Sequence, residues 1–110
     1  MTTMKKNVIK SDRHAAIVAN RIEKELRSEF DFLPELNITR EKFGVYRVIK
    51  CHKDSDCLTS TFVRTAIECV EKYEYRYKYN GVFWNIAVKD VNGESMPIFE
   101  VNVWYKHEVK

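Results

Sequence analysis

Two Asn-Gly dipeptides in the C-terminal third constrain the fold of this chain more than any other feature. Asn80-Gly81 follows an alternating run of polar and aromatic residues at 73–79. Asn92-Gly93 lies between two further alternating runs, at 82–89 and 96–106. Asn-Gly is the preferred sequence of the two-residue type I′ turn, which joins antiparallel strands. The pattern therefore predicts an antiparallel three-stranded meander.

The two turns also predict which residues lie opposite one another. A turn at Asn80-Gly81 gives four pairs: Tyr79 with Val82, Tyr77 with Trp84, Tyr75 with Ile86 and Tyr73 with Val88. A turn at Asn92-Gly93 gives four more: Val88 with Pro97, Ile86 with Phe99, Trp84 with Val101 and Val82 with Val103. Because side chains alternate between the faces of a strand, these residues share one face, which we expect to be buried. We also expect Gly81→Val to destabilise the first hairpin, since both turn positions need positive φ.

Two amphipathic helices are available to cover that apolar face. Ser11 is a good N-cap for the first helix, and Asp12 places a negative charge in its first turn. Its apolar stripe recurs at three- and four-residue spacing and comprises Ala15, Val18, Ala19, Ile22, Leu26 and Phe30. A second helix is predicted from Thr59 or Ser60 to about Tyr73. We expect the linker around Pro34 to pack over the core through Phe32, Leu33, Leu36 and Ile38.

The segment 43–51 fits two kinds of secondary structure. Its β-branched and aromatic residues favour a strand, although Val45, Tyr46, Val48 and Ile49 also have helical spacing. Gly44 favours the strand, because Gly costs a helix interior about 1 kcal/mol. If a strand at 43–51 lies in the same sheet as 73–79, to which a helix joins it, the two are expected to run parallel with a right-handed crossover.

The predicted element order is α-β-α-β-β-β. The fold class is α+β: a two-layer sandwich in which the antiparallel three-stranded C-terminal meander, with a fourth strand, packs on two helices. With 110 residues, the chain is long enough for one core. We expect a single domain at 11–110 after a flexible, basic N-terminal segment at 1–10, in which Val8 and Ile9 touch the body.

Composition limits the setting in which the protein works. A hydrophobic content of 45% with 32% charged residues is typical of a globular chain. No apolar run reaches membrane-spanning length and the start has no signal-peptide core, so we expect no membrane association. Three cysteines, an odd number without a secretion signal, favour free thiols in the cytoplasm. The abundance of Lys, Asn, Ile and Tyr would suit an AT-rich genome such as that of a bacteriophage.

The face of the meander that points away from the helices is the candidate interaction surface. Phe83 should lie opposite Asn102, with Trp104 diagonally beside it at about 7–8 Å. Three cations are expected around these rings. The predicted partner-binding residues are Phe83, Trp104, Arg76, Lys78, Asn85, Asn102 and Lys106.

Two classes of partner suit such a surface. Trp, Tyr, Phe and Arg are enriched at protein hot spots, so we favour a non-enzymatic binding module, such as an adaptor, inhibitor or assembly factor. Its partner would be another protein or a second copy of the chain. If the last strand lies at a sheet edge, its backbone could also recruit a partner strand. The alternative is sequence-tolerant binding of single-stranded nucleic acid, because exposed aromatics fringed by cations stack bases and hold phosphates. The net charge of +3 permits an anionic partner without requiring one.

The alternating tyrosines at 73, 75, 77 and 79 allow a different hypothesis. A row of rings could form a cation–π cage or a small-molecule pocket between the sheet and the helices. The same residues share a face with Val82 and Trp84, so we favour core rings whose hydroxyls reach the rim.

Metal binding and catalysis find little support in the sequence. Cys51-His52 and Cys57 have C-H-x₄-C spacing without the second ligand pair of a zinc site, and Cys69 falls on an apolar helix stripe. Asp54 and Asp56 lie near His52 in what reads as a solvated loop. The chain has no assembled nucleophile, base and oxyanion hole and no glycine-rich phosphate loop. We therefore expect no metal, no cofactor and no enzymatic activity.

Overall fold

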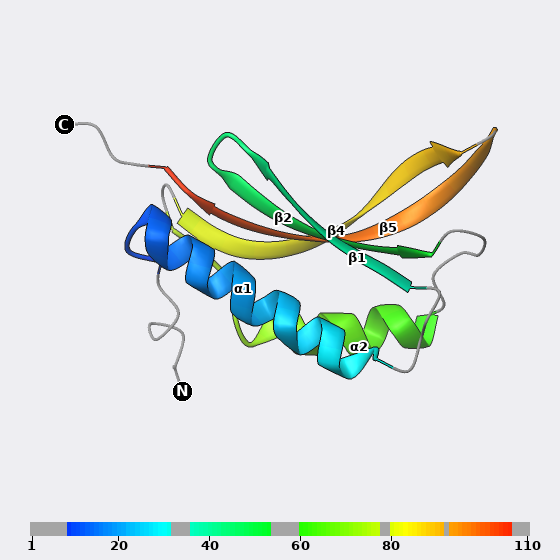
Figure 1. Ribbon diagram of the computed structural model, residues 1–110, viewed down its shortest axis with the longest axis horizontal. Coiled ribbons are helices and arrows are strands. Elements are labelled where there is room, and N and C mark those ends of the chain that lie inside the picture. Colours follow the sequence, from blue (N-terminus) through cyan, green and yellow to red (C-terminus); the bar gives the residue numbers. More distant parts are fainter. Residues whose placement is uncertain (1–8, 32–35, 54–59, 78–79, 92, 107–110) are drawn as a thin grey trace.

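The computed structural model describes residues 9–31, 36–53, 60–77, 80–91 and 93–106. Across these residues the chain forms two helices and five strands: α1 (Asp12–Glu29), β1 (Leu36–Phe43), β2 (Tyr46–Lys53), α2 (Ser60–Glu71), β3 (Tyr75–Tyr77), β4 (Asn80–Val91) and β5 (Glu94–Tyr105). The strands form one sheet in the order β1-β2-β5-β4-β3, and every neighbouring pair is antiparallel. Both helices lie on the same side of the sheet (Figure 1), which confirms the two-layer α+β sandwich.

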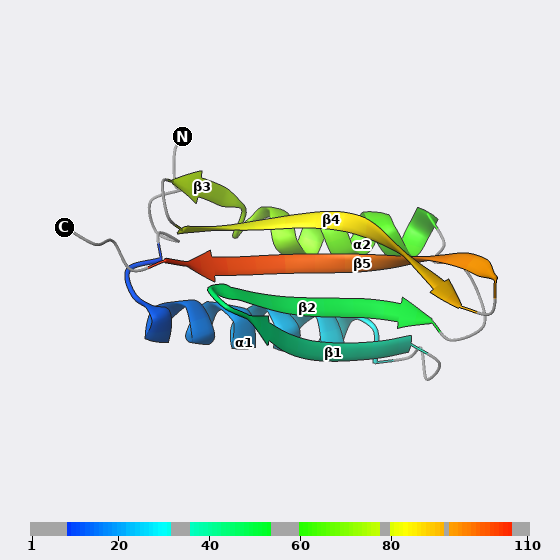
Figure 2. The same cartoon turned by 90° about the horizontal axis from the view of Figure 1, so that it is seen from above.

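The helices divide the inner face of the sheet between them. From above, α1 runs beneath the β1–β2 side of the sheet and α2 beneath β4 (Figure 2). The packing agrees, because α1 contacts β2 and β5, whereas α2 contacts β4 and α1. No helix among the described residues is long and apolar enough to cross a membrane.

Helix α1 begins where its local sequence predicts, and it ends at Glu29, before Pro34. The Ser11 hydroxyl accepts the His14 N–H at 3.0 Å, and the Phe30 N–H donates to the Leu26 carbonyl at 3.0 Å. The predicted apolar stripe is buried. Ile9 is also fully buried, ahead of the helix, while residues 1–8 lie outside the described part of the chain. The flexible N-terminal segment and the single domain at 11–110 stay predictions.

Aromatic rings join the two layers at the centre of the core. Phe62 of α2 lies 4.3 Å from Phe30 and 6.5 Å from Phe99 of β5, measured between ring centroids. Phe99 also stacks on Trp84 of β4 at 5.6 Å. Phe99 has no exposed surface, and Phe62 is 5% exposed. One ring of β5 therefore packs against both a helix and the neighbouring strand.

The register predicted from Asn92-Gly93 is confirmed. Strand β4 pairs with β5 through Val88–Pro97, Ile86–Phe99, Trp84–Val101 and Val82–Val103. Gly93 has a φ of 83°, the left-handed conformation that favours glycine in such a turn.

The register predicted from Asn80-Gly81 is wrong, and so are the Tyr75–Ile86, Tyr77–Trp84 and Tyr73–Val88 pairs. Strand β3 pairs with β4 through Tyr75–Val82 and Tyr77–Asn80, so the connection falls at residues 78–79, outside the described part. Asn80 and Gly81 belong to β4 and pair with Tyr105 and Trp104 of β5. The added ladder pairs with β5 outweigh the local turn preference. The argument from turn geometry that Gly81→Val destabilises the hairpin therefore no longer applies.

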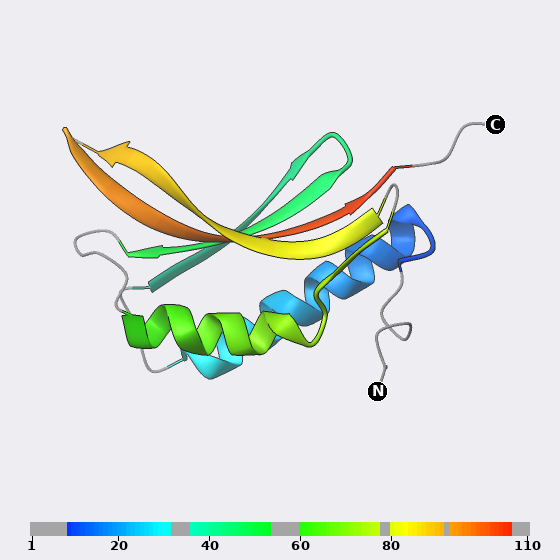
Figure 3. The ribbon, with the colours of Figure 1, turned by 180° about the vertical axis from the view of Figure 1, so that it is seen from behind.

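The burial predicted for the apolar row holds only where a helix lies beneath it. Tyr73, Phe99 and Val101 are buried and Trp84 packs partly against the core. Ile86 and Val88, however, are 41% and 69% exposed. The reason is visible in Figures 1 and 3, where the far end of the β4–β5 hairpin curves away from α2. The side chains of the tyrosines at 75, 77 and 79 are not among those described.

The strand predicted at 43–51 is confirmed only for 46–51, which belong to β2, whereas Phe43 ends the neighbouring strand β1 that the sequence reading missed. Residues 36–43 form β1 instead of a linker, and Gly44 lies in the two-residue connection to β2 with a φ of 59°. Leu36 and Ile38 still pack partly on the core, as expected. The observed element order is therefore α-β-β-α-β-β-β, with one strand more than predicted.

The predicted parallel relation between the strand at 43–51 and the strand at 73–79 is wrong. Strand β2 pairs with β5, and β3 pairs with β4 at the opposite edge. Because each neighbouring pair is antiparallel, β2 and β3 run in opposite directions. The crossover through α2 passes both β5 and β4, so the rule for adjacent parallel strands does not apply.

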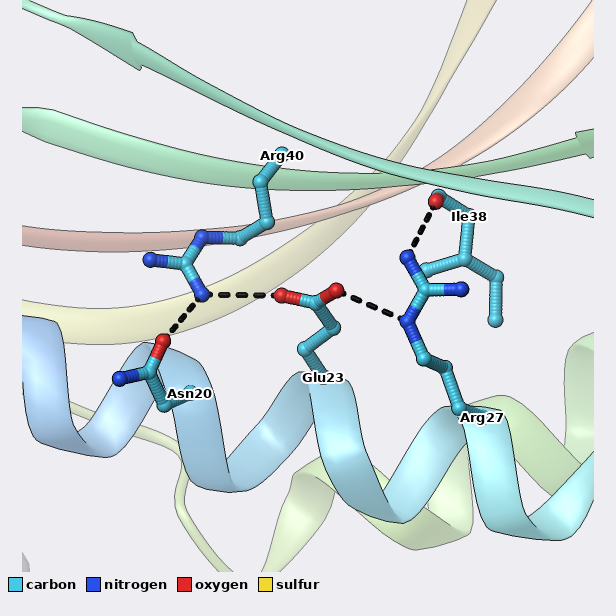
Figure 4. A network of polar contacts seen from close by, with 5 residues as sticks. All are labelled: Asn20, Glu23, Arg27, Ile38 and Arg40. Atoms are coloured by element: carbon cyan, nitrogen blue, oxygen red, sulfur yellow. Dashed lines mark hydrogen bonds and ion pairs between the residues drawn. The ribbon is translucent and has the colours of Figure 1, made fainter.

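Strand β1 is fixed to α1 by a polar network (Figure 4). Glu23 accepts from Arg27 Nε at 2.8 Å and from Arg40 Nη1 at 2.9 Å. Arg40 also donates to the Asn20 side chain at 2.6 Å, and Arg27 Nη2 donates to the Ile38 carbonyl at 2.7 Å. These contacts place α1 alongside β1, one of the two edge strands.

Candidate functional site

The sheet face opposite the helices carries a hollow of about 500 Å³, which we call the outer groove. It lies between the β1–β2 and β4–β5 hairpins, which both curve away from the helices (Figures 1 and 3). None of the described helices or strands covers it. Its lining side chains are Phe43, Tyr46, Val48, Lys50, Phe83, Asn85, Glu100 and Asn102.

Aromatic rings form one end of the outer groove. Tyr46 of β2 lies opposite Trp104 of β5, with ring centroids 6.1 Å apart. Phe83 of β4 meets Trp104 edge-on at 5.4 Å and an interplanar angle of 76°. Phe43 and Tyr46 remain 55% and 40% exposed. Rings from four strands therefore lie near one another at this end of the groove.

Neutral amides form the floor of the groove. Asn102 is only 9% exposed and lies opposite Phe83, as predicted. Its Nδ2 donates to Asn85 Oδ1 at 2.8 Å, and Asn85 Nδ2 donates to Glu100 Oε1 at 3.4 Å. Val48, on the other side of Asn102, is buried. The amides are thus held in one orientation by each other and by apolar packing.

The charges of the groove are distributed unevenly. Lys50 pairs with Glu41 of β1 at 3.2 Å, and its ammonium lies 5.4 Å from the centre of the Phe43 ring. Glu100 lies directly opposite Lys50 in the β2–β5 register. Within the described part of the chain, Glu100 forms no ion pair and accepts only the long Asn85 hydrogen bond. The lining therefore holds one ammonium and one carboxylate, and the ammonium pairs with Glu41 outside the lining.

The structure brings together four of the predicted partner-binding residues: Phe83, Trp104, Asn85 and Asn102. Lys106 follows β5 directly and is exposed. Arg76 lies in β3, but its side chain is not described, and Lys78 lies outside the described residues. The predicted fringe of three cations therefore stays a prediction.

Sequence reasoning missed the half of the groove that β1 and β2 supply. Phe43, Tyr46, Val48 and Lys50 were assigned to a strand whose neighbour could not be identified. Their alternation already placed Tyr46, Val48 and Lys50 on one face. The missing information was the pairing of β2 with β5, which joins residues far apart in the sequence.

Recruitment of a partner strand was expected only if the last strand lies at a sheet edge, and it does not. Strand β5 is the central strand, flanked by β2 and β4. The described edges are β1, β3 and the part of β4 beyond Val82, which β3 does not reach. Arg27 already occupies the Ile38 carbonyl of β1. Strand recruitment through β5 is therefore excluded by its two neighbours.

The structure separates the residues that were considered for metal binding and thiol chemistry. Consecutive strand residues point to opposite faces, so Cys51 faces the helices and His52 the other side. Burial raises the pKa of the Cys51 thiol to about 12, which makes it a poor nucleophile. No group of three or more metal-binding side chains occurs among the described residues, and Asp54, Asp56 and Cys57 lie outside them.

A second polar cluster joins the two helices. Tyr73 donates its hydroxyl hydrogen bond to Glu25, and Lys72 pairs with the same carboxylate at 2.6 Å. Burial and the Glu25 bond raise the pKa of Tyr73 to about 12. Burial opposes ionisation of Glu25, but its bonds to Lys72 and Tyr73 outweigh that effect and lower its pKa. The role of this cluster is therefore structural, because its contacts connect α1 to the end of α2.

Comparisons with known proteins identify no relative of this chain. No protein-family model matches the chain, and it has no significant match among curated proteins or solved structures.

Proposed function

We propose that the chain is a non-enzymatic protein-binding module whose partner occupies the outer groove. The observation that carries this proposal is the convergence of Phe43, Tyr46 and Phe83 on one hollow that no described element covers, with Trp104 packed against Tyr46 and Phe83 at its end. Large aromatic side chains around a partly desolvated pocket are the typical anchors of protein interfaces. The groove also contains amide groups that can pair with a polypeptide backbone.

Two features favour a protein partner over single-stranded nucleic acid. Glu41 and Glu100 lie in or beside the groove, where carboxylates repel a phosphate backbone. Phe83 and Trp104 also meet edge-on, whereas stacking of successive bases needs open ring faces. Nucleic-acid binding nevertheless remains the alternative, with Trp104 as its main stacking residue.

The test of the protein proposal is affinity capture from an extract of the cells that produce this chain. Wild type is compared with Trp104→Ala and Tyr46→Ala, and Ile17→Ala serves as the matched control. Ile17 is 45% exposed but lies on α1, in the other layer. We expect a protein that wild type and the Ile17 variant retain and both groove variants lose. Equal capture by all four proteins contradicts the proposal.

The alternative is tested with fluorescent mixed-sequence single-stranded RNA and DNA at about 50 and 200 mM salt. Phosphate contacts are strongly screened by salt, whereas an apolar protein interface is not. Micromolar binding that weakens with salt and with Trp104→Ala would support nucleic-acid binding. A partner that is a second copy of the chain would instead appear as a concentration-dependent mass in sedimentation, reduced by Trp104→Ala. Cytoplasmic location and phage origin stay predictions of the sequence.

A further inference from the structure

We infer that the outer groove binds an arginine side chain of the partner, with Glu100 as its counter-ion. This inference rests on the proposed function and names the chemistry of the group that enters the groove. Three properties of the groove support it: hydrogen-bond acceptors without described donors, a carboxylate without an ion pair among the described residues, and aromatic walls.

The floor of the groove has more acceptors than donors. Asn102 uses its Nδ2 on Asn85, and no described residue donates to its Oδ1. Glu100 accepts one bond of 3.4 Å from Asn85, which is long for a carboxylate and leaves most of its acceptor capacity free. A guanidinium carries five N–H donors in a planar fork and no acceptor. It therefore matches what these two side chains lack.

The charge of the groove favours a cationic group. Lys50 lies opposite Glu100 in register, yet it pairs with Glu41 on the other side, over the Phe43 ring. The Glu100 carboxylate is thus left for a cation from outside. Half-buried surroundings strengthen such an attraction relative to bulk water.

The walls distinguish arginine from lysine. Phe83 lies beside Asn102 across the β4–β5 pair, and Tyr46 approaches from β2. A guanidinium can lie flat on an aromatic ring while its edge binds a carboxylate bidentately, whereas an ammonium is a compact and strongly hydrated charge. We therefore expect arginine to bind more tightly than lysine.

The experiment uses N-acetyl-arginine amide as the probe and the full chain as the receptor. The readout is the NMR signals of the Asn85 and Asn102 side-chain amides and of the Trp104 indole N–H. The N-acetyl amides of citrulline, which is uncharged and nearly isosteric, and of lysine are titrated in parallel. We expect saturable shifts with a millimolar Kd for arginine, about fivefold or more below that of citrulline.

Glu100→Gln is the decisive variant, because glutamine keeps an acceptor for Asn85 and removes the charge. We expect arginine binding to weaken about tenfold, with an unchanged unfolding midpoint. Glu71→Gln, at an exposed position at the end of α2, is the matched control and should bind like wild type. Equal binding of arginine and citrulline, no shift at these signals, or full binding by Glu100→Gln would each overturn the inference.

The two proposals fail in different ways. A protein captured through Trp104 and equally well by Glu100→Gln supports the binding module but overturns the arginine site. Arginine binding that depends on Glu100, together with capture that is insensitive to Trp104, supports the site and contradicts the module.

Discussion

The two faces of the central strand β5 have very different surroundings. On the inner face, Phe99, Val101 and Val103 have no exposed surface and belong to the hydrophobic core. On the outer face, Trp104 is half-buried and the strand continues through Asn102 and Glu100. An apolar layer over this face would remove the hydration of Glu100, which costs free energy, and no described helix or strand covers it. The inner face therefore forms the core, and the outer face is the one on which the proposed binding site lies.

The inner face itself is divided by the extent of the helices. Val82 and Val88 point to the same side of β4, yet the first is fully buried and the second is 69% exposed. The twist of the β4–β5 hairpin lifts its far end from α2 (Figure 3). Burial therefore depends on whether a helix lies beneath the strand as well as on the face of the sheet.

The largest difference between the faces is expected from Phe99→Ala and Phe83→Ala. Removing the Phe99 ring leaves a cavity between Phe62 and Trp84 and should cost about 3–5 kcal/mol in the free energy of unfolding. The partly exposed Phe83 should cost about 1 kcal/mol. Urea unfolding of both variants measures the two losses in the free energy of unfolding. Equal losses would mean that the outer face also contributes to the core.

A pH-dependent effect is expected at Tyr73, which bonds to Glu25 of α1. In the folded protein Tyr73 loses its proton near pH 12, above its ordinary pKa of 10.0, because of burial and the Glu25 bond. The resulting stability is present below pH 10 and is lost as the pH rises toward 12, on the order of 1–3 kcal/mol.

Replacing Tyr73 with phenylalanine removes this titrating group. The free energy of unfolding should then fall less steeply between pH 9 and 12 than in wild type, although the raised pKa of Cys51 acts in the same direction in both proteins. Denaturant titrations at several pH values provide the measurement. Identical slopes in the two proteins would show that Tyr73 does not hold its proton more tightly when folded.

A smaller effect tests how the helix layer holds the edge strand. Glu23→Gln removes the carboxylate that accepts from Arg27 and Arg40, and we expect a loss of about 1 kcal/mol that decreases in high salt. Hydrogen exchange of the β1 amides should accelerate more than that of β4. Glu29→Gln, exposed in the last turn of α1, is the control. Equal effects of the two substitutions would exclude a role for the network.

The smallest effect is expected at Val88, on the inner face but beyond the helices. Val88→Lys should change the free energy of unfolding by no more than about 0.5 kcal/mol. Val101→Lys, at a fully buried position on the same face, should prevent folding. Thermal unfolding of Val88→Lys and Val101→Lys distinguishes these two outcomes. Strong destabilisation by Val88→Lys would show that the far end of the hairpin is covered.

Local patterns in the sequence predicted those parts of the fold that local interactions stabilise. Ser11 and the apolar spacing gave α1, and Asn92-Gly93 gave the β4–β5 register. The same patterns failed where a non-local pairing competes, because Asn80-Gly81 extends the ladder with β5 instead of turning. Of the site, Phe83, Trp104, Asn85 and Asn102 were predicted together, since they lie on strands joined by one turn.

The sequence by itself determined the class of fold, the alternation that separates two faces of each strand, and the aromatic and amide residues of the β4–β5 half of the groove. Only the tertiary structure decided that β2 pairs with β5, which makes the last strand central and brings Tyr46 and Lys50 into the groove. Periodicity reports which way a side chain points, whereas the choice of a neighbouring strand depends on the packing of the whole sheet. The tertiary structure also decided that Ile86 and Val88 stay exposed, because the twist of a sheet accumulates over several strands.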